Sequence, residues 1–319
     1  MILTQLNIFL ILLLVALVYL KLARKFGIID VPNQRSSHRD STVRGGGILI
    51  PAAVILWWLV YDYQHTWMVI GLLWISSISF LDDIYELSKK LRFSVQIIAL
   101  AMCFYDLELF DHFSFYTWPI FFFIALGIIN AVNFMDGING ISGLYGIVFF
   151  GTILVLDVKV QFIDPAMIHY VLMALSVFLF FNLRKKALMF AGDIGSISMA
   201  YMMIFLMTKW YIATQSWTII LLLMVYGLDV FLTMIQRFRR GERILEPHRS
   251  HLYQRLVNEK KIPHILIAII YAFLQAIINY FLFISQENNL PEPFYAALVL
   301  IVFGLCYYPI KYQVEKNYI

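Results

Sequence analysis

The polar run from Asn130 to Gly140 is the part of the sequence best suited to chemistry. It reads Asn-Ala-Val-Asn-Phe-Met-Asp-Gly-Ile-Asn-Gly and follows an apolar segment directly. Because Asn130, Asn133 and Asp136 are three residues apart, a helix would present two amides and a carboxylate on one face. Oxygen ligands of this kind suit Mg²⁺. Core packing is a weak alternative, since amides and acids in an apolar segment need polar partners.

Two adjacent carboxylates, Asp82 and Asp83, end another apolar segment. Lys89, Lys90 and Arg92 follow them. Repulsion between neighbouring carboxylates would favour the protonated form of one of them, which suits it to proton transfer. A solvated helix end is the alternative, but the C-terminal end of a helix dipole is an unfavourable place for two acids. We therefore predict a catalytic role for the pair.

Two glycine-flanked segments also carry charges. Arg44 precedes Gly45–Gly47, whose backbone N–H groups would be able to approach an anion at a helix start. Taken alone, a tight turn is the interpretation that we favour for these glycines. Asp193 lies between Gly192 and Gly195 at the start of another predicted helix. Asp is a favoured helix N-cap, but the glycines would equally allow a metal or a phosphate to approach.

Residues 236–261 form the longest polar stretch in the second half of the chain and are dense in arginine and histidine. They include His248, Arg249 and His251, side chains that bind a diphosphate well. The usual excess of basic residues in cytoplasmic loops explains many of the arginines, but not the two histidines that flank Arg249. Asp229, in the preceding apolar segment, is expected to pair with a basic residue, and direct catalysis is the second interpretation.

Composition shows which kind of element must position these side chains. Of 319 residues, 61% are hydrophobic and 14% charged, far from the roughly 45–50% apolar and 25% charged of soluble domains. We therefore predict an all-α polytopic transmembrane bundle of about eleven helices, since a bilayer core needs about 20 apolar residues per helix. Residues 1–319 would form a single integral membrane catalytic domain. The expected spans are about 2–22, 45–62, 67–81, 93–109, 117–135, 141–157, 164–182, 194–209, 216–235, 264–285 and 294–310.

Basic residues predict the orientation of these helices. Of 24 Lys and Arg residues, only Lys159 and Lys209 fall in loops on one side of this arrangement. Positively charged loops stay in the cytoplasm. We therefore expect the N-terminus outside, the C-terminus inside, and all of the polar motifs on the cytoplasmic face.

Five motifs in this order resemble those of the polyprenyl-phosphate N-acetylhexosamine-1-phosphate transferase superfamily. This superfamily includes the phospho-N-acetylmuramoyl-pentapeptide transferases and the initiators of O-antigen and teichoic acid synthesis. The resemblance covers almost the whole chain, and the last motif is more similar to the branch that initiates O-antigen or capsule chains. The motifs are Asp82-Asp83, residues 130–140, Phe181-Asn182, residues 192–196 (Gly-Asp-Ile-Gly-Ser) and residues 247–255 (Pro-His-Arg-Ser-His-Leu-Tyr-Gln-Arg).

The resemblance implies a reaction. A sugar 1-phosphate would pass from a UDP-N-acetylhexosamine to undecaprenyl phosphate in the bacterial inner membrane, releasing UMP and initiating a cell-surface polysaccharide such as lipopolysaccharide. Mg²⁺ would be required, with Mn²⁺ as the alternative. Membrane lipid surrounds such a protein, a homodimer is an open alternative to a monomer, and no nucleic acid is expected. The sugar, and covalent or direct attack, are left open.

The resemblance also implies roles for individual residues. Asp193 with Asn133 would hold Mg²⁺, the Asp82-Asp83 pair would lie at the lipid phosphate, and Asp136 would lie near the nucleotide or the metal. The implied or expected substrate-binding residues are Asn130, Asn139, Arg92, His248, Arg249, His251 and Arg44.

Two positions depart from the family pattern. Asn139 stands where the family commonly has a second acid, which bears on base or sugar recognition. Residues 184–186 (Arg-Lys-Lys) stand where a stretch containing proline is frequent.

A membrane transporter for an anion or a phosphorylated substrate, using the same basic loops, is the alternative function. Transporter sites usually lie near the bilayer midplane, on broken helices within paired repeats. The polar groups of this chain are instead expected at the cytoplasmic rim, which favours the enzyme.

Overall fold

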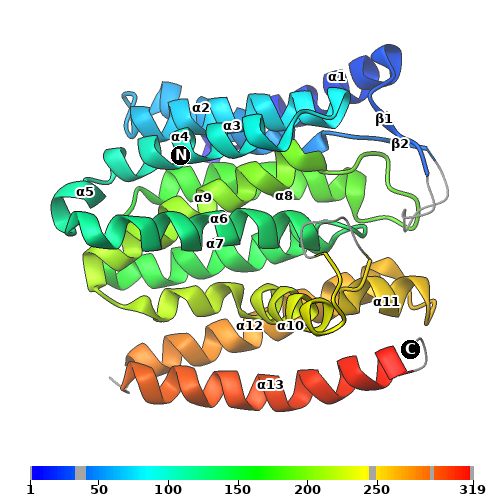
Figure 1. Ribbon diagram of the computed structural model, residues 1–319. Coiled ribbons are helices and arrows are strands. Elements are labelled where there is room, and N and C mark those ends of the chain that lie inside the picture. The colour runs from blue at the N-terminus through cyan, green and yellow to red at the C-terminus, as the bar shows by residue number, and fades with distance from the viewer. Residues whose placement is uncertain (1, 33–40, 244–248, 288–290, 317–319) are drawn as a thin grey trace.

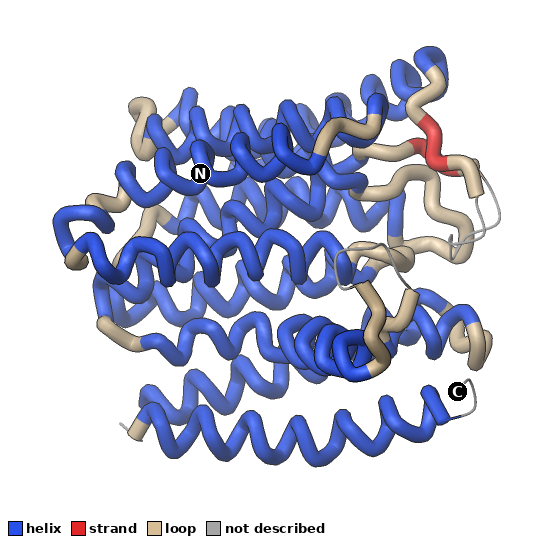
Figure 2. Tube along the Cα trace, in the orientation of Figure 1, coloured by secondary structure: helices blue, strands red, loops and turns tan. Residues whose placement is uncertain are grey.

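The computed structural model describes residues 2–32, 41–243, 249–287 and 291–316. Within these ranges the chain is helical apart from two short strands and the loops (Figure 1; Figure 2). Elements labelled η are short 3₁₀ helices. The elements in order are α1 (Ile2–Phe26), β1 (Ile29–Asp30), β2 (Thr42–Val43), η1 (Gly46–Ile48), α2 (Leu49–Val60), α3 (Thr66–Tyr85), α4 (Lys89–Asp106), α5 (Leu109–His112), η2 (Phe115–Thr117), α6 (Trp118–Met135), α7 (Ile141–Val160), α8 (Pro165–Asn182), α9 (Gly192–Thr214), η3 (Trp217–Leu223), α10 (Met224–Arg239), α11 (Leu252–Asn258), α12 (His264–Glu287) and α13 (Glu292–Lys316).

The predicted all-α polytopic membrane fold is confirmed. Nine helices among the described residues are long and apolar enough to cross a membrane. The other two expected spans are also helical but differ in character: Gly46–Val60 is shorter, and α4 begins with Lys89, Lys90 and Arg92. Length and charge therefore separate these two segments from the nine.

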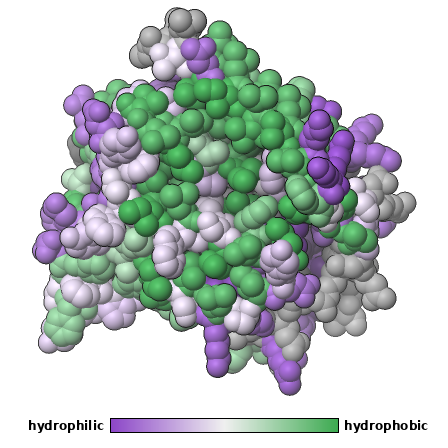
Figure 3. Space-filling model, turned by 90° about the horizontal axis from the view of Figure 1, so that it is seen from above, coloured by the Kyte–Doolittle hydropathy of each residue, from purple (hydrophilic) through white to green (hydrophobic). Residues whose placement is uncertain are grey.

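The outer surface of the bundle is apolar, as lipid contact requires. Large hydrophobic side chains such as Leu14, Phe123, Val158 and Leu305 are mostly exposed on long helices. Figure 3 shows a broad apolar area across the middle of one face, with most hydrophilic residues toward its margins. A soluble protein would not expose so large a patch.

Helix α9 lies at the centre of the bundle and α13 at its edge. In the most apolar stretch of α9, 72% of the residues are buried, against 17% in the corresponding stretch of α13. Among the described residues, helix α9 packs against α2, α3, α4, α6 and α7, whereas α13 packs mainly against α11, α12 and η3. The residues at the start of α9 are therefore held by several helices at once.

The loops that carry the predicted motifs gather at one end of the bundle. Strands β1 and β2, α11 and the C-terminal end of α13 lie at this end, on the right of Figure 1, and α5 lies at the opposite end. Strand β2 also bridges to Met189 in the loop before α9. The C-terminal end of α3 and the N-terminal end of α9 meet here through hydrogen bonds described below.

Glycines bring the start of α2 against the start of α9. The N–H groups of Gly46 and Gly47 donate to the carbonyls of Phe190 (2.7 Å) and Ala191 (3.0 Å). A Cβ added at Gly47 would lie 2.0 Å from the Cα of Gly195. The N–H groups of Gly46 and Gly47 are therefore taken up by protein carbonyls.

Helix boundaries differ from the sequence prediction in the polar regions. Helix α3 continues through Asp82 and Asp83 to Tyr85. The ninth predicted span begins as the 3₁₀ helix η3 before α10, and α11 forms within the stretch predicted as a loop. Apolar periodicity predicts the spans well but says little about short polar helices.

The close approach of α2 and α9 predicts the effect of a methyl group. Gly195→Ala would place a Cβ 2.8 Å from both Gly47 Cα and Ala191 Cβ, so we expect a loss of about 1–3 kcal/mol in the free energy of unfolding. The measurement is the thermal midpoint of the purified protein. Gly151→Ala, in α7 with open space around it, is the control and should be neutral or slightly stabilising. Equal effects of the two changes would contradict this packing.

Candidate active site

The carboxylate of Asp83 joins the end of α3 to the start of α9. Its Oδ1 accepts the N–H of Asp193 (2.9 Å), and its Oδ2 accepts the N–H of Ile194 (3.2 Å). Arg44 Nε lies 2.7 Å from Asp83 Oδ1, and the Asp83 side chain is 0% exposed. A carboxylate on the first N–H groups of a helix is favoured by both hydrogen bonding and the helix dipole. The α9 dipole therefore offsets the unfavourable α3 end that holds this acid.

Gly192 makes room for this contact. Its φ is +72°, a conformation that glycine adopts readily. A Cβ at this position would lie 2.5 Å from Asp83 Oδ2 and 2.9 Å from the Gly45 nitrogen. The glycine before Asp193 is therefore needed for the carboxylate to reach the helix start.

Asp82, the other member of the predicted catalytic pair, points to a different set of groups. Its Oδ1 accepts the N–H of Leu87 (2.6 Å), and its Oδ2 accepts from Arg92 Nη1 (2.6 Å). Ser88 caps α4 by accepting the N–H of Leu91, which sets Arg92 in the first turn of that helix. Asp82 therefore fixes the turn between α3 and α4 and orients Arg92.

Asp193 projects toward both arginines. Arg44 Nη2 lies 3.3 Å from Asp193 Oδ1, and Arg92 Nη1 lies 3.8 Å from Asp193 Oδ2. The helix-cap interpretation of Asp193 is wrong: Ala191 occupies the cap position of α9, and Asp83 supplies the capping oxygens. At 21% exposure, the Asp193 side chain is also more open than that of Asp83.

Asn133 reaches the same helix start from α6. Its Nδ2 donates to Ser196 Oγ (3.0 Å), three residues beyond Asp193. The two predicted metal ligands, Asp193 and Asn133, therefore come from different helices to one place. Ser196 is the contact that sequence reasoning did not single out, although it is part of the Gly-Asp-Ile-Gly-Ser motif.

Asp136 lies beside this group in the turn after α6. Its Oδ1 accepts a hydrogen bond from Ser142 Oγ (2.6 Å). Burial raises the pKa of Asp136 to about 6; the Ser142 bond lowers it, the charge of Asp193 raises it, and Arg44 lowers it. Asp136 is therefore within electrostatic reach of Asp193 and Arg44.

Asn139 and Asn182 hold two of the site loops together. The Nδ2 of Asn139 donates to the Arg184 carbonyl (2.8 Å), and Asn139 is 5% exposed. Asn182 accepts the Gly140 N–H (2.6 Å) and donates to the Met189 carbonyl. The Asn139 amide nitrogen is thus bonded within the protein, and its role in sugar recognition stays a prediction.

Asn130 does not join the charged cluster, which consists of Asp83, Asp193, Arg44 and Arg92 with Asn133 beside them. Its side chain is exposed on α6, and its Nδ2 donates to the Leu126 carbonyl of the same helix (2.7 Å). The expected common face therefore holds for Asn133 and Asp136 only, and substrate binding by Asn130 stays a prediction.

The basic loop before α11, which carries Arg249 and His251, packs on the turn that carries Asp136. His251 is 1% exposed, and its ring lies 6.1 Å from that of Phe134. Tyr253 Oη donates to the Phe134 carbonyl (2.9 Å). Arg249 lies two residues before His251 with intermediate exposure, and His248 lies outside the described residues. The loop of the last motif is thus next to the turn of the second motif.

Asp229 pairs with a basic residue, as predicted. It is fully buried, and its Oδ1 lies 3.4 Å from both Lys311 Nζ and His251 Nδ1. It lies under the basic loop and takes no direct part in the cluster around Asp193.

The donor groups fit a divalent cation that is shared with a phosphorylated ligand. Across the described ranges, no three His, Cys, Asp or Glu side chains converge on one metal position. Mg²⁺ commonly takes one or two carboxylates and completes its coordination with water and substrate phosphates. Asp193 with the Asn133 amide matches that pattern, and Arg44 and Arg92 supply the positive charge that phosphates need.

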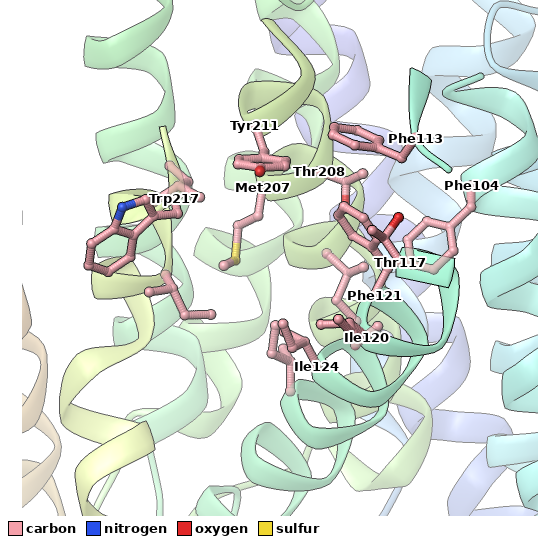
Figure 4. Close-up of a pocket in the computed structure, with 15 residues that line it drawn as sticks. Phe104, Phe113, Thr117, Ile120, Phe121, Ile124, Met207, Thr208, Tyr211 and Trp217 are labelled. Atoms are coloured by element: carbon pink, nitrogen blue, oxygen red, sulfur yellow. The ribbon is translucent and has the colours of Figure 1, made fainter. Parts of the chain in front are cut away.

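A separate apolar cavity of about 470 Å³ lies between α6, α9 and η3 (Figure 4). Aromatic and aliphatic side chains dominate its lining, including Phe113, Phe121, Met207, Tyr211 and Trp217. Phe121 of α6 and Met207 and Tyr211 of α9 lie in the halves of these helices away from Asn133 and Asp193, so the cavity is distinct from the charged cluster.

The chain is similar to known glycosyl transferases. The model of glycosyl transferase family 4 matches residues 65–211, which include Asp82, Asp83, Asp136 and Asp193. A probable undecaprenyl-phosphate N-acetylglucosaminyl 1-phosphate transferase of Bacillus subtilis (strain 168) is 26% identical over 258 residues, covering 74% of this chain and 72% of the relative. Undecaprenyl-phosphate alpha-N-acetylglucosaminyl 1-phosphate transferases of Escherichia coli (strain K12) and Yersinia pestis are 26% and 27% identical, each match covering 91% of this chain and 86% of the relative.

The family model and the relatives point to the same class of transferase. The resemblance of the motifs to the polyprenyl-phosphate N-acetylhexosamine-1-phosphate transferase superfamily is therefore confirmed.

Burial of Asp136 predicts a pH-dependent effect on stability. A folded-state pKa of about 6, above its ordinary 3.8, means that ionisation destabilises the fold as pH rises from about 4 to above 6. Asp136→Asn keeps an oxygen for Ser142 and removes that charge. Its stability relative to wild type should therefore rise by about 1 kcal/mol between pH 5 and pH 8.

The measurement for Asp136→Asn is the thermal midpoint at both pH values with a chelator present. An Asp136→Asn difference from wild type that is the same at pH 5 and pH 8 would show that this carboxyl is not held in a desolvated position.

Proposed function

We propose that this protein transfers an N-acetylhexosamine 1-phosphate from a UDP-sugar to undecaprenyl phosphate, releasing UMP. The observation that carries the proposal is Asp193, partly exposed at the start of α9 and flanked by Arg44 and Arg92. Phosphoryl transfer needs charge neutralisation and in-line positioning more than covalent protein chemistry. The names of these relatives give the same acceptor and an N-acetylglucosaminyl 1-phosphate group.

Asp193 and Asn133 are the residues that would hold Mg²⁺, with Mn²⁺ as a substitute. When bound, such a cation neutralises developing charge on the diphosphate and orients it. Arg44 and Arg92 now pair with carboxylates. When substrate binds, their remaining N–H donors would contact phosphate oxygens, since a guanidinium carries five.

A phosphate oxygen of the lipid would attack the phosphorus next to the sugar, and the bond from that phosphorus to the UMP oxygen would break. The Asp82-Asp83 pair would position this lipid phosphate through Arg92 and Arg44. Covalent attack by Asp83 is disfavoured, because its oxygens already accept two helix N–H groups. Direct attack by the lipid is therefore the pathway that we favour.

The basic residues before α11 are proposed to bind the diphosphate. Arg249 precedes His251, whose loop rests on the turn of Asp136. Positive charge from these residues would add to that of Arg44, which also acts electrostatically on Asp136. Binding of the diphosphate by His248, Arg249 and His251 is part of this proposal.

The apolar cavity is suited to part of the polyprenyl chain. Its lining is almost entirely hydrocarbon, and it lies along the same helix, α6, that carries Asn133 at its polar end. A chain lying along α6 would connect hydrocarbon in the cavity to a phosphate at the charged cluster.

The charged cluster is proposed to face the cytoplasm of a bacterial inner membrane. Lys159 and Lys209 are the basic residues of α7 and α9 near the opposite end of the bundle, and loops rich in Lys and Arg stay inside. A cytosolic UDP-sugar would then reach Asp193 directly. Initiation of an O-antigen or capsule chain is the pathway that the last motif favours.

The transporter alternative has less support. The acidic and basic residues of the cluster lie at the ends of α3 and α9 and not on helices broken at mid-membrane.

The test is an assay of purified protein with undecaprenyl phosphate, Mg²⁺ and a panel of UDP-sugars, scored for lipid product and UMP. We expect UMP and lipid diphosphosugar to form together, with one UDP-N-acetylhexosamine preferred and no turnover in chelator. Asp193→Asn should reduce turnover by about 100-fold or more, as loss of a charge-stabilising group does, while its thermal midpoint stays near wild type.

Asp111→Asn is the matched control, because Asp111 is exposed on α5 at the opposite end. It should turn over as wild type does. Wild-type turnover by Asp193→Asn with an unchanged Mg²⁺ requirement would remove Asp193 from the metal site, and absence of lipid product with every UDP-sugar would overturn the proposed function.

A further inference from the structure

Helix α13 buries one lysine at the edge of the bundle. Lys311 is 0% exposed, although most of α13 faces outward. Its Nζ lies 3.4 Å from Asp229 Oδ1 and contacts Thr233 Oγ1, both on α10. A cation without water needs an opposite charge and hydrogen bonds around it. This lysine therefore binds α13 to the carboxylate of Asp229.

Asp229 connects four helices. Its Oδ1 faces Lys311 of α13. Its Oδ2 accepts a hydrogen bond from the hydroxyl of Tyr271 on α12 (2.8 Å). Its Oδ1 accepts the N–H of Leu252, the first residue of α11 (3.0 Å), and lies 3.4 Å from His251 Nδ1. One buried carboxylate thus receives groups from α11, α12 and α13 while it belongs to α10.

The contact with Leu252 fixes where α11 begins. His251 is the N-cap residue of α11, so a carboxylate on the following N–H sets both the helix start and the histidine before it. A negative charge at a helix N-terminus is favourable. The charge of the Asp229 carboxylate would be costly to bury without a cation beside it. Lys311, which is fully buried, supplies that cation.

Helix α11 in turn supports the turn that carries Asp136. Tyr253 Oη donates to the Phe134 carbonyl (2.9 Å). A Cβ at Gly137 would lie 2.2 Å from that same hydroxyl, so the tyrosine fits closely against the turn. A shift of α11 would therefore move His251 and the Asp136 turn together.

We propose that Lys311 is a positioning residue of the active site: by holding Asp229, it fixes the start of α11 and thereby the places of His251 and the Asp136 turn. The part of this inference that concerns catalysis rests on the proposed function. Lys311 itself touches no substrate. The opposing interpretation is that Lys311 only anchors α13 to the bundle.

The first test needs no activity. Lys311→Met removes the charge with a similar chain length, and hydrogen exchange reports on amides whose bonds open. We expect the Leu252–Asn258 amides to exchange about 10-fold faster in Lys311→Met, with those of α9 unchanged. Lys311→Arg, which keeps the charge, should restore most of the protection. Tyr312→Phe, exposed on the same helix, is the control and should exchange as wild type does.

The second test measures kcat and KM for both substrates. Misplaced catalytic groups lower kcat by about 10- to 100-fold, so Lys311→Met should lower kcat while the KM for undecaprenyl phosphate changes little. Lys311→Arg, which keeps the positive charge, should retain much of the wild-type kcat. The double variant Lys311→Met/Asp229→Asn should lose less thermal stability than the two single variants lose in total, because it leaves no lone buried charge.

The outcomes separate the two ideas. Wild-type exchange at α11 in Lys311→Met, with only α13 loosened, would overturn the positioning role and leave an anchor. Faster exchange at α11 with wild-type kcat would also overturn it. Faster exchange in a protein whose wild type makes no lipid product would instead reject the proposed function, while the structural link from Lys311 to α11 would stand.

Discussion

The site depends on one carboxylate that caps a helix to which it does not belong. Asp83 ends α3, yet its oxygens bind the first N–H groups of α9 and the guanidinium of Arg44. This contact sets the direction in which Asp193 projects and leaves Arg44 positioned to bridge two acids. Glycine at 192 and the close approach at Gly47 make the contact possible. The packing of α2, α3 and α9 and the charge pattern of the site therefore have one common cause.

The same device occurs a second time in the bundle. Asp229 binds the first N–H of α11 and is balanced by Lys311, as Asp83 binds the start of α9 and is balanced by Arg44. In a low-dielectric interior an acid is tolerated when a helix N-terminus and a cation both face it. The starts of α9 and α11, which these two carboxylates fix, both lie near the Asp136 turn.

The sequence predicted the helical membrane fold and the pairing of Asp229, because apolar length and intramembrane charge are strong local signals. It did not predict that Asp83, and not Asp193, caps α9, because a cap supplied by another helix leaves no local pattern. Spacing alone placed Asn130 with Asn133, but Asn130 bonds to its own helix. Lys311 was counted only as a cytoplasmic charge, since nothing near it in the chain marks burial.

The central claim is that the start of α9 forms a divalent cation site shared with the nucleotide. Mn²⁺ binding to purified protein, followed by electron paramagnetic resonance with and without UDP, tests it most directly. Because Mg²⁺-type sites draw ligands from phosphates, wild type should bind Mn²⁺ tightly only with UDP present. Asp193→Asn should lose that binding, and Asp111→Asn should keep it. UDP-dependent Mn²⁺ binding that is unchanged in Asp193→Asn would contradict the claim.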